Sequence, residues 1–510
     1  MGELPSPTLI QSGLANSIAT PVVMSDTGVD LQPSSQRTVS GFFVPGVEGV
    51  GPGDSRAGSV IDRIMALDEH AITRSLRDLT TRFSGRYPNL IQLFRENADR
   101  VLSRVDPTAE ISEARTLFLG AAFTHEFSIE SAALCNPSIV LAPDGANLGQ
   151  TDAAIRFVMS VRGIGEGHRS SIGFRTGSVA LDGQVEFDVA GAFPVTGERI
   201  SGSNDRNLFH HKLAEVGDDG ENASFVLDAL PPVFDDNQLR ARLDELSIDA
   251  ATRLRTSDTI ANLYRIADSS YAVEFETATQ LSERVLWPQA KAERNGMEDA
   301  RFVRFTDDDG AVTYLATYTA FDGTLVAQHL LQTSDFRCFR VSQMAGPAAT
   351  GKGLAIFPRK VGGQYVALSR WDRDGNWVSF SDDIRCWTSL VPIQVAEQPW
   401  ETLQLGNCGS PIETDAGWLV ITHGVGPMRT YSIGAVLLDL DDPCRIIARS
   451  IEPIITPRAD DVGGYVPNVV YSCGAMVANG NLIIPYGVGD RSIRVATVEL
   501  ASLLGGMRRM

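Results

Sequence analysis

The sequence predicts an all-β protein with helices on its N-terminal side, and two observations support this fold class. After Asn136, short runs of β-branched and aromatic residues alternate with Gly, Asp and Asn turns, as in 314–318 and 482–486. This spacing is typical of a sandwich, a barrel or a propeller. Two runs, 331–336 and 377–383, each contain Ser-Asp after a strand-like stretch and lie roughly one propeller blade apart. This faint repeat favours the propeller.

The 510-residue chain exceeds the usual size of a single core, so several structural units are expected. Residues 1–57 are rich in Ser, Gly and Pro and lack periodicity, which predicts a loosely ordered arm. Residues 58–128 carry apolar side chains at helical spacing and are interpreted as a helical cap. The β domain then covers 129–505, and an acidic segment at about 197–269, with helical character, is interpreted as an insertion between blades.

Composition excludes several classes of partner. The net charge of −19 disfavours nucleic acid and anionic membrane surfaces, whereas neutral sugars remain compatible. No apolar run is long enough to span a bilayer, and the first basic residue is Arg37, so a secretory signal is not expected. The six cysteines form no C-x-x-C pair, which suits a reducing cytoplasm and predicts neither a disulfide scaffold nor a zinc site.

Two local patterns imitate known sites and are set aside. Residues 346–353 resemble a phosphate-binding P-loop, but Gly353 stands where that loop needs Ser or Thr, and 354–358 has the character of a strand. His210 and His211 have no partner at metal-ligand spacing, and we interpret them as solvated. No metal site is therefore predicted.

One charged segment carries the chemistry. Glu298 and Asp299 are adjacent carboxylates, Arg301 follows, and Gly296 allows a sharp turn before a β-branched strand. A carboxyl group with a like-charged neighbour tends to a raised pKa, as the acid that cleaves a glycosidic bond requires. The alternative is a surface turn stabilised by an acid–arginine pair, and without further context that alternative is the more common case.

The context is a resemblance to a family. Residues 296–301, Gly-Met-Glu-Asp-Ala-Arg, resemble the G-I-E-D-P-R signature of glycoside hydrolase family 130, the β-mannoside phosphorylases and mannosidases. Further stretches resemble family motifs in the family's order, and they lie at 136–137, 162, 169–173, 318–322, 352–360, 409–425, 431–443, 468–474 and 486–490. The likeness runs from about 130 to 500 outside the insertion, whereas the arm and the helical cap have no counterpart in the compact members.

The resemblance implies a five-bladed propeller with the sugar at one mouth of its central channel. It implies that Asp299 is the general acid, acting through the mannose 3-hydroxyl, while inorganic phosphate attacks the opposite face with inversion. Arg359 and His423 match family phosphate contacts, and Arg162 and Arg169 are plausible additions to them. No cofactor is implied beyond phosphate as co-substrate, and a homo-oligomer is possible because oligomers are common in the family.

The family also suggests residues that contact the substrate. These are Asn136, Glu298, Arg301, Lys352, Asp461 and Asp490. Three departures from the family pattern stand out: Gln404 replaces a phosphate-site lysine, Asp461 replaces a glutamate, and Ala300 replaces a proline. Gln404 removes one positive charge from the expected phosphate site, but the retained Arg359 and His423 favour phosphorolysis.

Three functional hypotheses follow. The first is an inverting β-mannoside phosphorylase that releases α-mannose 1-phosphate from a β-mannoside or an oligosaccharide. The second, motivated by Gln404, is an inverting β-mannosidase. The third is a sugar-binding propeller without catalysis. The sequence does not determine the glycosidic linkage, because the acceptor side would be formed by loops and by the insertion.

Overall fold

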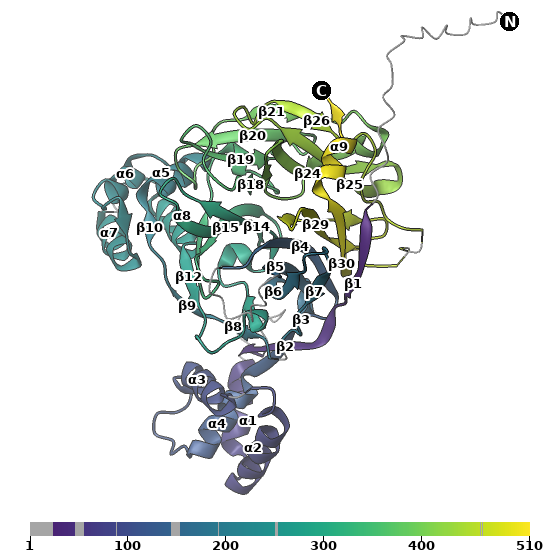
Figure 1. Cartoon of the computed structure of the whole chain (residues 1–510). Coiled ribbons are helices and arrows are strands. Elements are labelled where there is room, and N and C mark those ends of the chain that lie inside the picture. The colour runs from purple at the N-terminus through teal and green to yellow at the C-terminus, as the bar shows by residue number, and fades with distance from the viewer. Residues whose placement is uncertain are drawn as a thin grey trace, which may run out of the picture.

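The sheets of the protein surround a common centre (Figure 1). The computed structural model describes residues 24–45, 56–87, 89–143, 154–191, 193–249, 253–459, 461 and 463–510. Within these residues the protein is mostly β, as the sequence predicts, and the α-helices belong to an N-terminal unit, to an insertion and to a short C-terminal helix, α9 (Leu500–Gly506). None of the helices described is both long enough and apolar enough to cross a membrane.

The largest sheet consists of two antiparallel runs. The first run is β4 (Ala133–Leu141), β5 (Ile155–Ile164), β6 (Ser170–Val179) and β7 (Val185–Phe187), and β13 (Arg284–Leu286) pairs with β6 and with β8 (Val195–Thr196). The second run is β14 (Gly296–Thr306), β15 (Val312–Phe321), β16 (Val326–Thr333), β17 (Cys338–Gln343), β12 (Tyr271–Glu274) and β9 (Glu198–Ser201). A single parallel bridge between Gly296 and Ser170 joins β14 directly to β6.

Three smaller sheets follow along the chain. The first contains β18 (Ala355–Ile356), β19 (Tyr365–Ser369), β20 (Asn376–Ser381) and β21 (Val391–Gln394). The second contains β22 (Gln404–Asn407), β23 (Ile412–Thr414), β24 (Gly417–Gly426), β25 (Thr430–Leu438), β26 (Ile446–Arg449) and β31 (Arg508–Arg509). The third contains β27 (Val470–Tyr471), β28 (Met476–Ala478), β29 (Asn481–Val488), β30 (Ser492–Glu499) and β1 (Ser25–Leu31).

Apolar clusters lie between neighbouring sheets and hold them face to face. One cluster joins β14 and β15 to β19, a second joins β19 and β20 to β24 and β25, and a third joins β24 and β25 to β29 and β30. A fourth joins β29 and β30 back to β4 and β5. Burial of apolar area is the main favourable contribution to folding, so this succession of clusters fixes how the sheets are arranged around the centre.

The arm predicted for residues 1–57 is not loosely ordered where the structure describes it. β1 pairs with β30 as the outer strand of the last sheet, and β2 (Ser34–Phe42) pairs with β3 (Thr124–Glu130). A sheet edge exposes unpaired amide and carbonyl groups, which a chain segment of mixed composition can satisfy without an apolar pattern of its own. The prediction failed for the described part because composition and missing periodicity do not report pairing at a sheet edge; residues 1–23 and 46–55 of the arm lie outside the described residues.

Residues 56–122 form four helices, as the helical spacing predicts. They are α1 (Arg56–Ala66), α2 (Glu69–Phe83), α3 (Leu90–Leu102) and α4 (Glu113–Ala122). Asp68 and Ser112 cap α2 and α4 by accepting hydrogen bonds from backbone amides of the first turn. Figure 1 shows that this helical unit projects from the β body below β2 and β3. The last residues of the predicted cap, from Thr124 onward, belong instead to β3.

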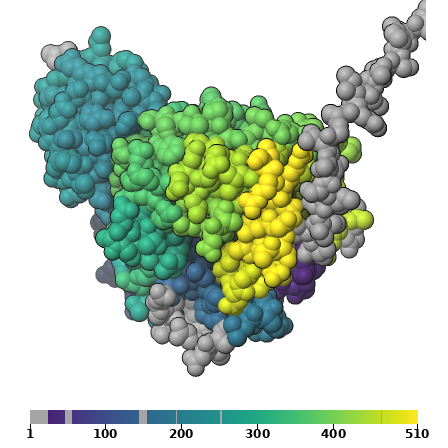
Figure 2. All heavy atoms as spheres, turned by 45° about the horizontal axis from the view of Figure 1, so that its top comes forward, coloured from purple at the N-terminus to yellow at the C-terminus, as the bar shows by residue number. Residues whose placement is uncertain are grey.

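The insertion expected at about 197–269 is also helical. It contains β10 (Asn204–Asp205), α5 (Arg206–Glu215), α6 (Glu221–Leu227), β11 (Val233–Phe234), α7 (Asp236–Ile248) and α8 (Thr256–Asp268). These helices enclose an apolar cluster of their own, and Figure 2 shows the insertion as a lobe beside the β body. β9, at the start of the predicted segment, remains part of the large sheet.

A buried ionic triad fastens the N-terminal strands to the β body. Glu130 at the end of β3 accepts two hydrogen bonds from Arg175 of β6, at 2.8 and 2.9 Å, and lies 3.3 Å from the Nε atom of Arg37 on β2. Arg37 also donates to the carbonyl oxygens of Gly191 and Ser282. All three charged side chains are at least nine-tenths buried, so the carboxylate is required to neutralise the two guanidinium groups.

Replacing this carboxylate tests the attachment. We expect Glu130→Gln to lower the free energy of unfolding by about 3 kcal/mol, because it leaves two buried guanidinium groups without a counter-charge. The control is Glu113→Gln, which breaks an exposed pair with Arg95 and should cost less than about 1 kcal/mol. Chemical denaturation monitored by tryptophan fluorescence measures both changes. Equal stability of the two variants would show that the triad does not hold the strands.

Candidate active site

Asp299 lies at a bulge in β14. Glu298 pairs with Thr319 and Arg301 with Thr317, so three steps along β14 oppose two steps along β15. The extra residue is Asp299, whose φ of +55° lies in the left-handed region that Asp and Asn tolerate better than most residues. Bulges redirect side chains and often occur beside active sites. Here the bulge allows two adjacent carboxylates to contact the same group of cations.

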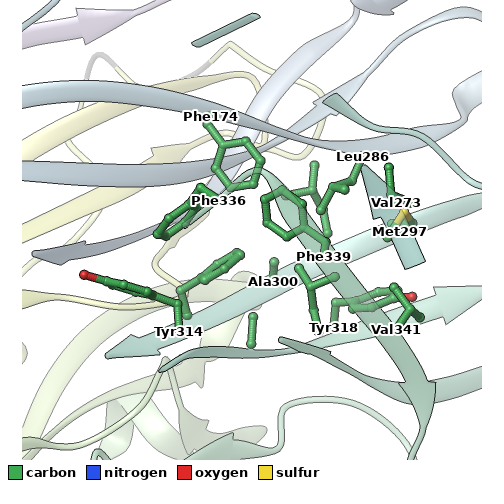
Figure 3. Packing of buried hydrophobic residues seen from close by; sticks show 14 of the residues in the cluster. Phe174, Val273, Leu286, Met297, Ala300, Tyr314, Tyr318, Phe336, Phe339 and Val341 are labelled. Atoms are coloured by element: carbon green, nitrogen blue, oxygen red, sulfur yellow. The ribbon is translucent and has the colours of Figure 1, made fainter. Parts of the chain in front are cut away.

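The residues on either side of the carboxylates anchor the bulge in the core. Met297 and Ala300 are 1% and 4% exposed and belong to the largest apolar cluster, which Figure 3 shows around Phe339 and Tyr318. In a regular strand these two positions would face opposite sides, and only the extra residue brings both into the core. Ala300, which stands where the family pattern has proline, packs its small side chain into this cluster.

Two cations hold the carboxylate pair. Arg162, on β5, donates to Asp299 Oδ1 at 3.1 Å and to Glu298 Oε1 at 2.6 Å, and its Nε atom donates to Ser170 at 2.9 Å. Lys352 donates to the other oxygen of Glu298 at 2.7 Å. Exposure rises from 9% for the Glu298 side chain through 14% for Asp299 to 44% for Lys352. The cluster therefore opens to solvent on the side of Lys352.

A second group of cations continues from Arg301. This fully buried arginine donates to the backbone carbonyls of Asp299 and Cys408 and to the hydroxyl of Tyr471, the last at 3.0 Å. Arg370 donates to the same hydroxyl at 3.2 Å, so Tyr471 lies between two guanidinium groups. Its ring also meets the ring of His423 at a centroid distance of 4.9 Å.

The conformation of Arg370 depends on two glycines. A Cβ atom on Gly406 would lie 2.2 Å from its Nε atom, and one on Gly353 would lie 2.9 Å from its Cδ atom. Only residues without a side chain leave this space for the guanidinium group. The Nε atom of Arg370 is buried without a hydrogen-bond partner among the described residues, which is costly unless a further acceptor binds there.

The charges around Asp299 set its pKa. Burial by itself would raise the pKa of Asp299, but the charges of Arg162, Arg301 and Lys352 outweigh burial and hold it below the usual value for an aspartate. The upward shift expected from the neighbouring carboxylate is therefore not found in this structure. Asp490 differs, because burial raises its pKa and the nearby Asp299 adds to the effect. The environment thus separates the pKa values of two neighbouring carboxyl groups.

His423 is neutral at neutral pH in this structure. Burial lowers its pKa well below the ordinary value, and the charges of Arg370 and Arg301 lower it further. Neither ring nitrogen has a hydrogen bond of normal geometry among the described residues. A buried imidazole in this state can bind an anion by taking up a proton.

Asn136 lies at a second bulge, in β4. Cys135 pairs with Arg162 and Ser138 with Ser160, so β4 also contains one extra residue. Asn136 has a φ of +48°, the same value as Asp490. Among the predicted residues, Arg162 contacts Asp299 directly, Glu298 shares Arg162 with it, Lys352 contacts Glu298, and Arg301 donates to the Asp299 carbonyl. The charge of Asp299 acts on Asp490, and Asn136 follows Cys135, the strand partner of Arg162.

Arg359 does not join this group, and its prediction as a phosphate contact is not supported by the geometry. Its guanidinium group pairs with Glu413 at 2.6 Å and stacks on Trp418 at 4.8 Å. The preceding residue, Pro358, accepts a hydrogen bond from Thr306 at the far end of β14. Seven residues of strand separate Thr306 from Asp299, or about 23 Å. Arg359 lines a separate pocket of about 500 Å³ there.

Three other predicted residues also make no contact with Asp299 among the described residues. Asp461 pairs with Arg494 at 2.8 Å in another pocket. Arg169 stacks on Trp287, with 5.5 Å from the guanidinium carbon to the ring centroid. Gln404 begins β22, two residues before Gly406 and on the same face of the strand, but no side-chain contact to the cluster is found.

Sequence reasoning missed Arg370 and Tyr471. A signal for Arg370 was present, because Arg162, Arg370 and His423 all lie on or directly after the second strand of their sheets, near its end. A comparison of the corresponding strands in successive sheets, and not of the Ser-Asp pair alone, would have identified Arg370. Tyr471 lies in a stretch that resembles the family, but its spacing gives no indication that its hydroxyl bridges two arginines.

The arrangement combines an acid with a local concentration of positive charge. Four cations (Arg162, Arg301, Lys352 and Arg370) lie among three carboxylates (Glu298, Asp299 and Asp490) in a chain whose net charge is −19. Guanidinium and ammonium groups of this kind bind a phosphate, and a carboxyl group protonates a leaving oxygen. Among the described residues, no group of His, Cys, Asp and Glu could hold a metal ion.

Proteins that cleave glycosidic bonds use carboxyl groups of this kind, and a β-rich scaffold can hold them. The comparisons with known proteins identify the family. The model of glycoside hydrolase family 130, described as beta-1,4-mannooligosaccharide phosphorylase, matches residues 253–509. The chain belongs to this family. The matched region includes Asp299, Lys352, Arg370, His423 and Tyr471, whereas Arg162, Asn136 and the N-terminal strands precede it.

The chain is similar to individual curated and solved proteins. The chain is 34% identical over 228 residues to a 1,2-beta-oligomannan phosphorylase of Thermoanaerobacter, covering 44% of this chain and 75% of the relative. It is 32% identical over 228 residues to a beta-1,2-mannobiose phosphorylase of Listeria innocua, covering 43% and 62%. The solved beta-1,2-mannobiose phosphorylase of Listeria innocua is 19% identical, with a TM-score of 0.42 and coverage of 79% of this chain and 95% of that chain.

Anion binding at this site is expected to be linked to protonation of His423. We expect binding of sulfate at about pH 6 to take up protons, because a dianion beside the buried imidazole favours its charged form. Isothermal titration calorimetry in two buffers of different ionisation enthalpy measures the uptake, and sulfate itself does not titrate in this range. His423→Asn should reduce the uptake. Undiminished proton uptake in that variant would contradict the assignment to His423.

Proposed function

We propose that this chain is an inverting β-mannoside phosphorylase, which transfers a mannosyl group from a β-mannoside to inorganic phosphate. The observation that carries the proposal is the contact of Asp299 with Arg162, beside the group formed by Arg301, Tyr471 and Arg370. In the reaction, a phosphate oxygen forms a bond to C1 of the mannosyl group while the bond from C1 to the leaving oxygen breaks. The products are α-mannose 1-phosphate and the shortened sugar.

Asp299 supplies the proton to the leaving oxygen, directly or through a substrate hydroxyl. In this structure its pKa is held low by Arg162, Arg301 and Lys352. A phosphate dianion bound among these cations offsets their charge and raises the pKa of Asp299, so that the acid is protonated when phosphate is bound. Phosphate is then both the nucleophile and the condition for acid catalysis. No cofactor besides phosphate takes part in this mechanism.

We also propose that the sheets are five blades of a propeller. The blades are β4–β7, β14–β17 with β12, β18–β21, β22–β26, and β27–β30 with β1. The support is that apolar clusters link these sheets in succession and return to the first, and that Asp299, Asn136 and Asp490 lie near the ends of strands in three of them. The β-mannoside enters the central channel at the end where these three residues lie.

Phosphate dependence tests the reaction. Incubating the full chain with β-1,2- and β-1,4-linked mannobiose should give mannose 1-phosphate only when phosphate is present. Equal turnover without phosphate would replace this proposal with the β-mannosidase, in which water is the nucleophile. Asp299→Asn should lower kcat by about 10²–10⁴-fold. Asp308→Asn, in the exposed turn after β14, is the matched control and should leave kcat unchanged.

A comparison of two arginines tests the phosphate site. We expect Arg370→Met to raise the KM for phosphate about 10- to 100-fold, because one charge-assisted hydrogen bond is lost. Arg359→Met should change this KM less than about twofold, since the structure pairs Arg359 with Glu413 far from Asp299. Initial rates at varied phosphate concentrations measure both. The opposite order would restore Arg359 as the phosphate contact.

A further inference from the structure

A row of aromatic rings lies where the N-terminal strands meet the β5–β6 turn. Trp287, which follows β13, lies 6.0 Å from Phe127 of β3, and Phe127 lies 4.5 Å from the ring of His125. His125 in turn lies 5.3 Å from Phe43, which follows β2. Phe43 is 40% exposed and the His125 side chain 37% exposed, so this end of the row is open to solvent.

The guanidinium group of Arg169 lies over this row. Its guanidinium carbon is 5.5 Å from the ring centroid of Trp287 and 6.0 Å from that of Phe127. No acceptor for its N–H groups is found among the described residues, and the side chain is half-buried. Stacking fixes the plane of a guanidinium group and leaves its donors free for a ligand. Glu166 contacts His125 at 3.2 Å and is 53% exposed. Its carboxylate therefore supplies a hydrogen-bond acceptor for a ligand beside the row.

The row is next to the candidate active site. Arg169 directly precedes Ser170, whose hydroxyl accepts a hydrogen bond from the Arg162 that holds Asp299. The side chain of Arg169 itself contacts Trp287 and Phe127 and not the Arg162–Asp299 pair. A ligand of Arg169 would therefore lie one sugar or more beyond the bond that is cleaved.

We infer that these residues form a subsite for the leaving-group side of a manno-oligosaccharide, beyond the first sugar. A pyranose has apolar C–H faces and a rim of hydroxyl groups, which match aromatic rings combined with a few fixed donors and acceptors. Arg169 and Glu166 together carry no net charge, so the surface suits a neutral ligand better than an anion. Phe43, His125 and Phe127 lie on or directly after β2 and β3, so the N-terminal strands form part of the subsite. A substrate long enough to reach the subsite gains these contacts, and a shorter one does not.

The inference rests on the proposed function, and substrate length tests it. Arg169→Ala should lower kcat/KM for the mannotriose and the mannotetraose about tenfold, as expected for lost hydrogen bonds from a charged donor. For the mannobiose the value should change less than twofold. Phe43→Ala, at an exposed position, should show the same length dependence. The matched control is Arg82→Ala, which removes a similar arginine–aromatic stack on Phe83 in the helical unit and should leave all three values unchanged.

Binding separates this inference from the proposed reaction. In an Asp299→Asn background, calorimetry should show that Arg169→Ala weakens mannotriose binding about tenfold and mannobiose binding less than twofold. This result supports the subsite even if the wild-type protein shows no phosphate-dependent turnover, which would reject the proposed function alone. An unchanged length profile, with a melting temperature equal to that of Arg82→Ala, would overturn the subsite. A lowered melting temperature with an unchanged profile would overturn it as well, leaving only a structural contact.

Discussion

The candidate site depends on the contact between Arg162 and the two carboxylates of the β14 bulge. The bulge places one extra residue between Met297 and Ala300, and both of these are fixed in the core. Asp299 is left in a left-handed conformation, which is tolerated only where the surrounding structure determines it. Arg162 supplies that constraint from β5, in the other run of the same sheet, and together with Arg301 and Lys352 it lowers the pKa of Asp299.

This constraint explains how a strongly acidic chain can hold a phosphate. The cations near Asp299 are few, and each is positioned by a specific contact, as Arg301 and Arg370 are by the hydroxyl of Tyr471. Because the site is mostly buried, these charges interact more strongly than they would at the surface. The field of the remaining acidic surface matters little at this range, since salt screens it beyond about 10 Å. The local arrangement therefore decides which ligand binds.

The sequence predicted the all-β class, the helices of the N-terminal unit and the insertion, and the residues grouped around Asp299. It succeeded where a side chain lies close in sequence to a motif, as Glu298 and Arg301 do. The geometry does not support the prediction for Arg359, because the residue before it, Pro358, pairs with Thr306, seven residues along β14 from Asp299. Sequence reasoning also missed Arg370, whose position depends on space left by Gly353 and Gly406. Contacts between sheets depend on three-dimensional packing that residue spacing does not encode.

The most direct test of the account is a crystal structure of the full chain grown with phosphate and mannose. The account predicts an anion bounded by Arg370, Lys352 and His423, with the mannose between it and Asp299. Density for the anion beside Arg359 and Glu413, with none near Arg370, would contradict it.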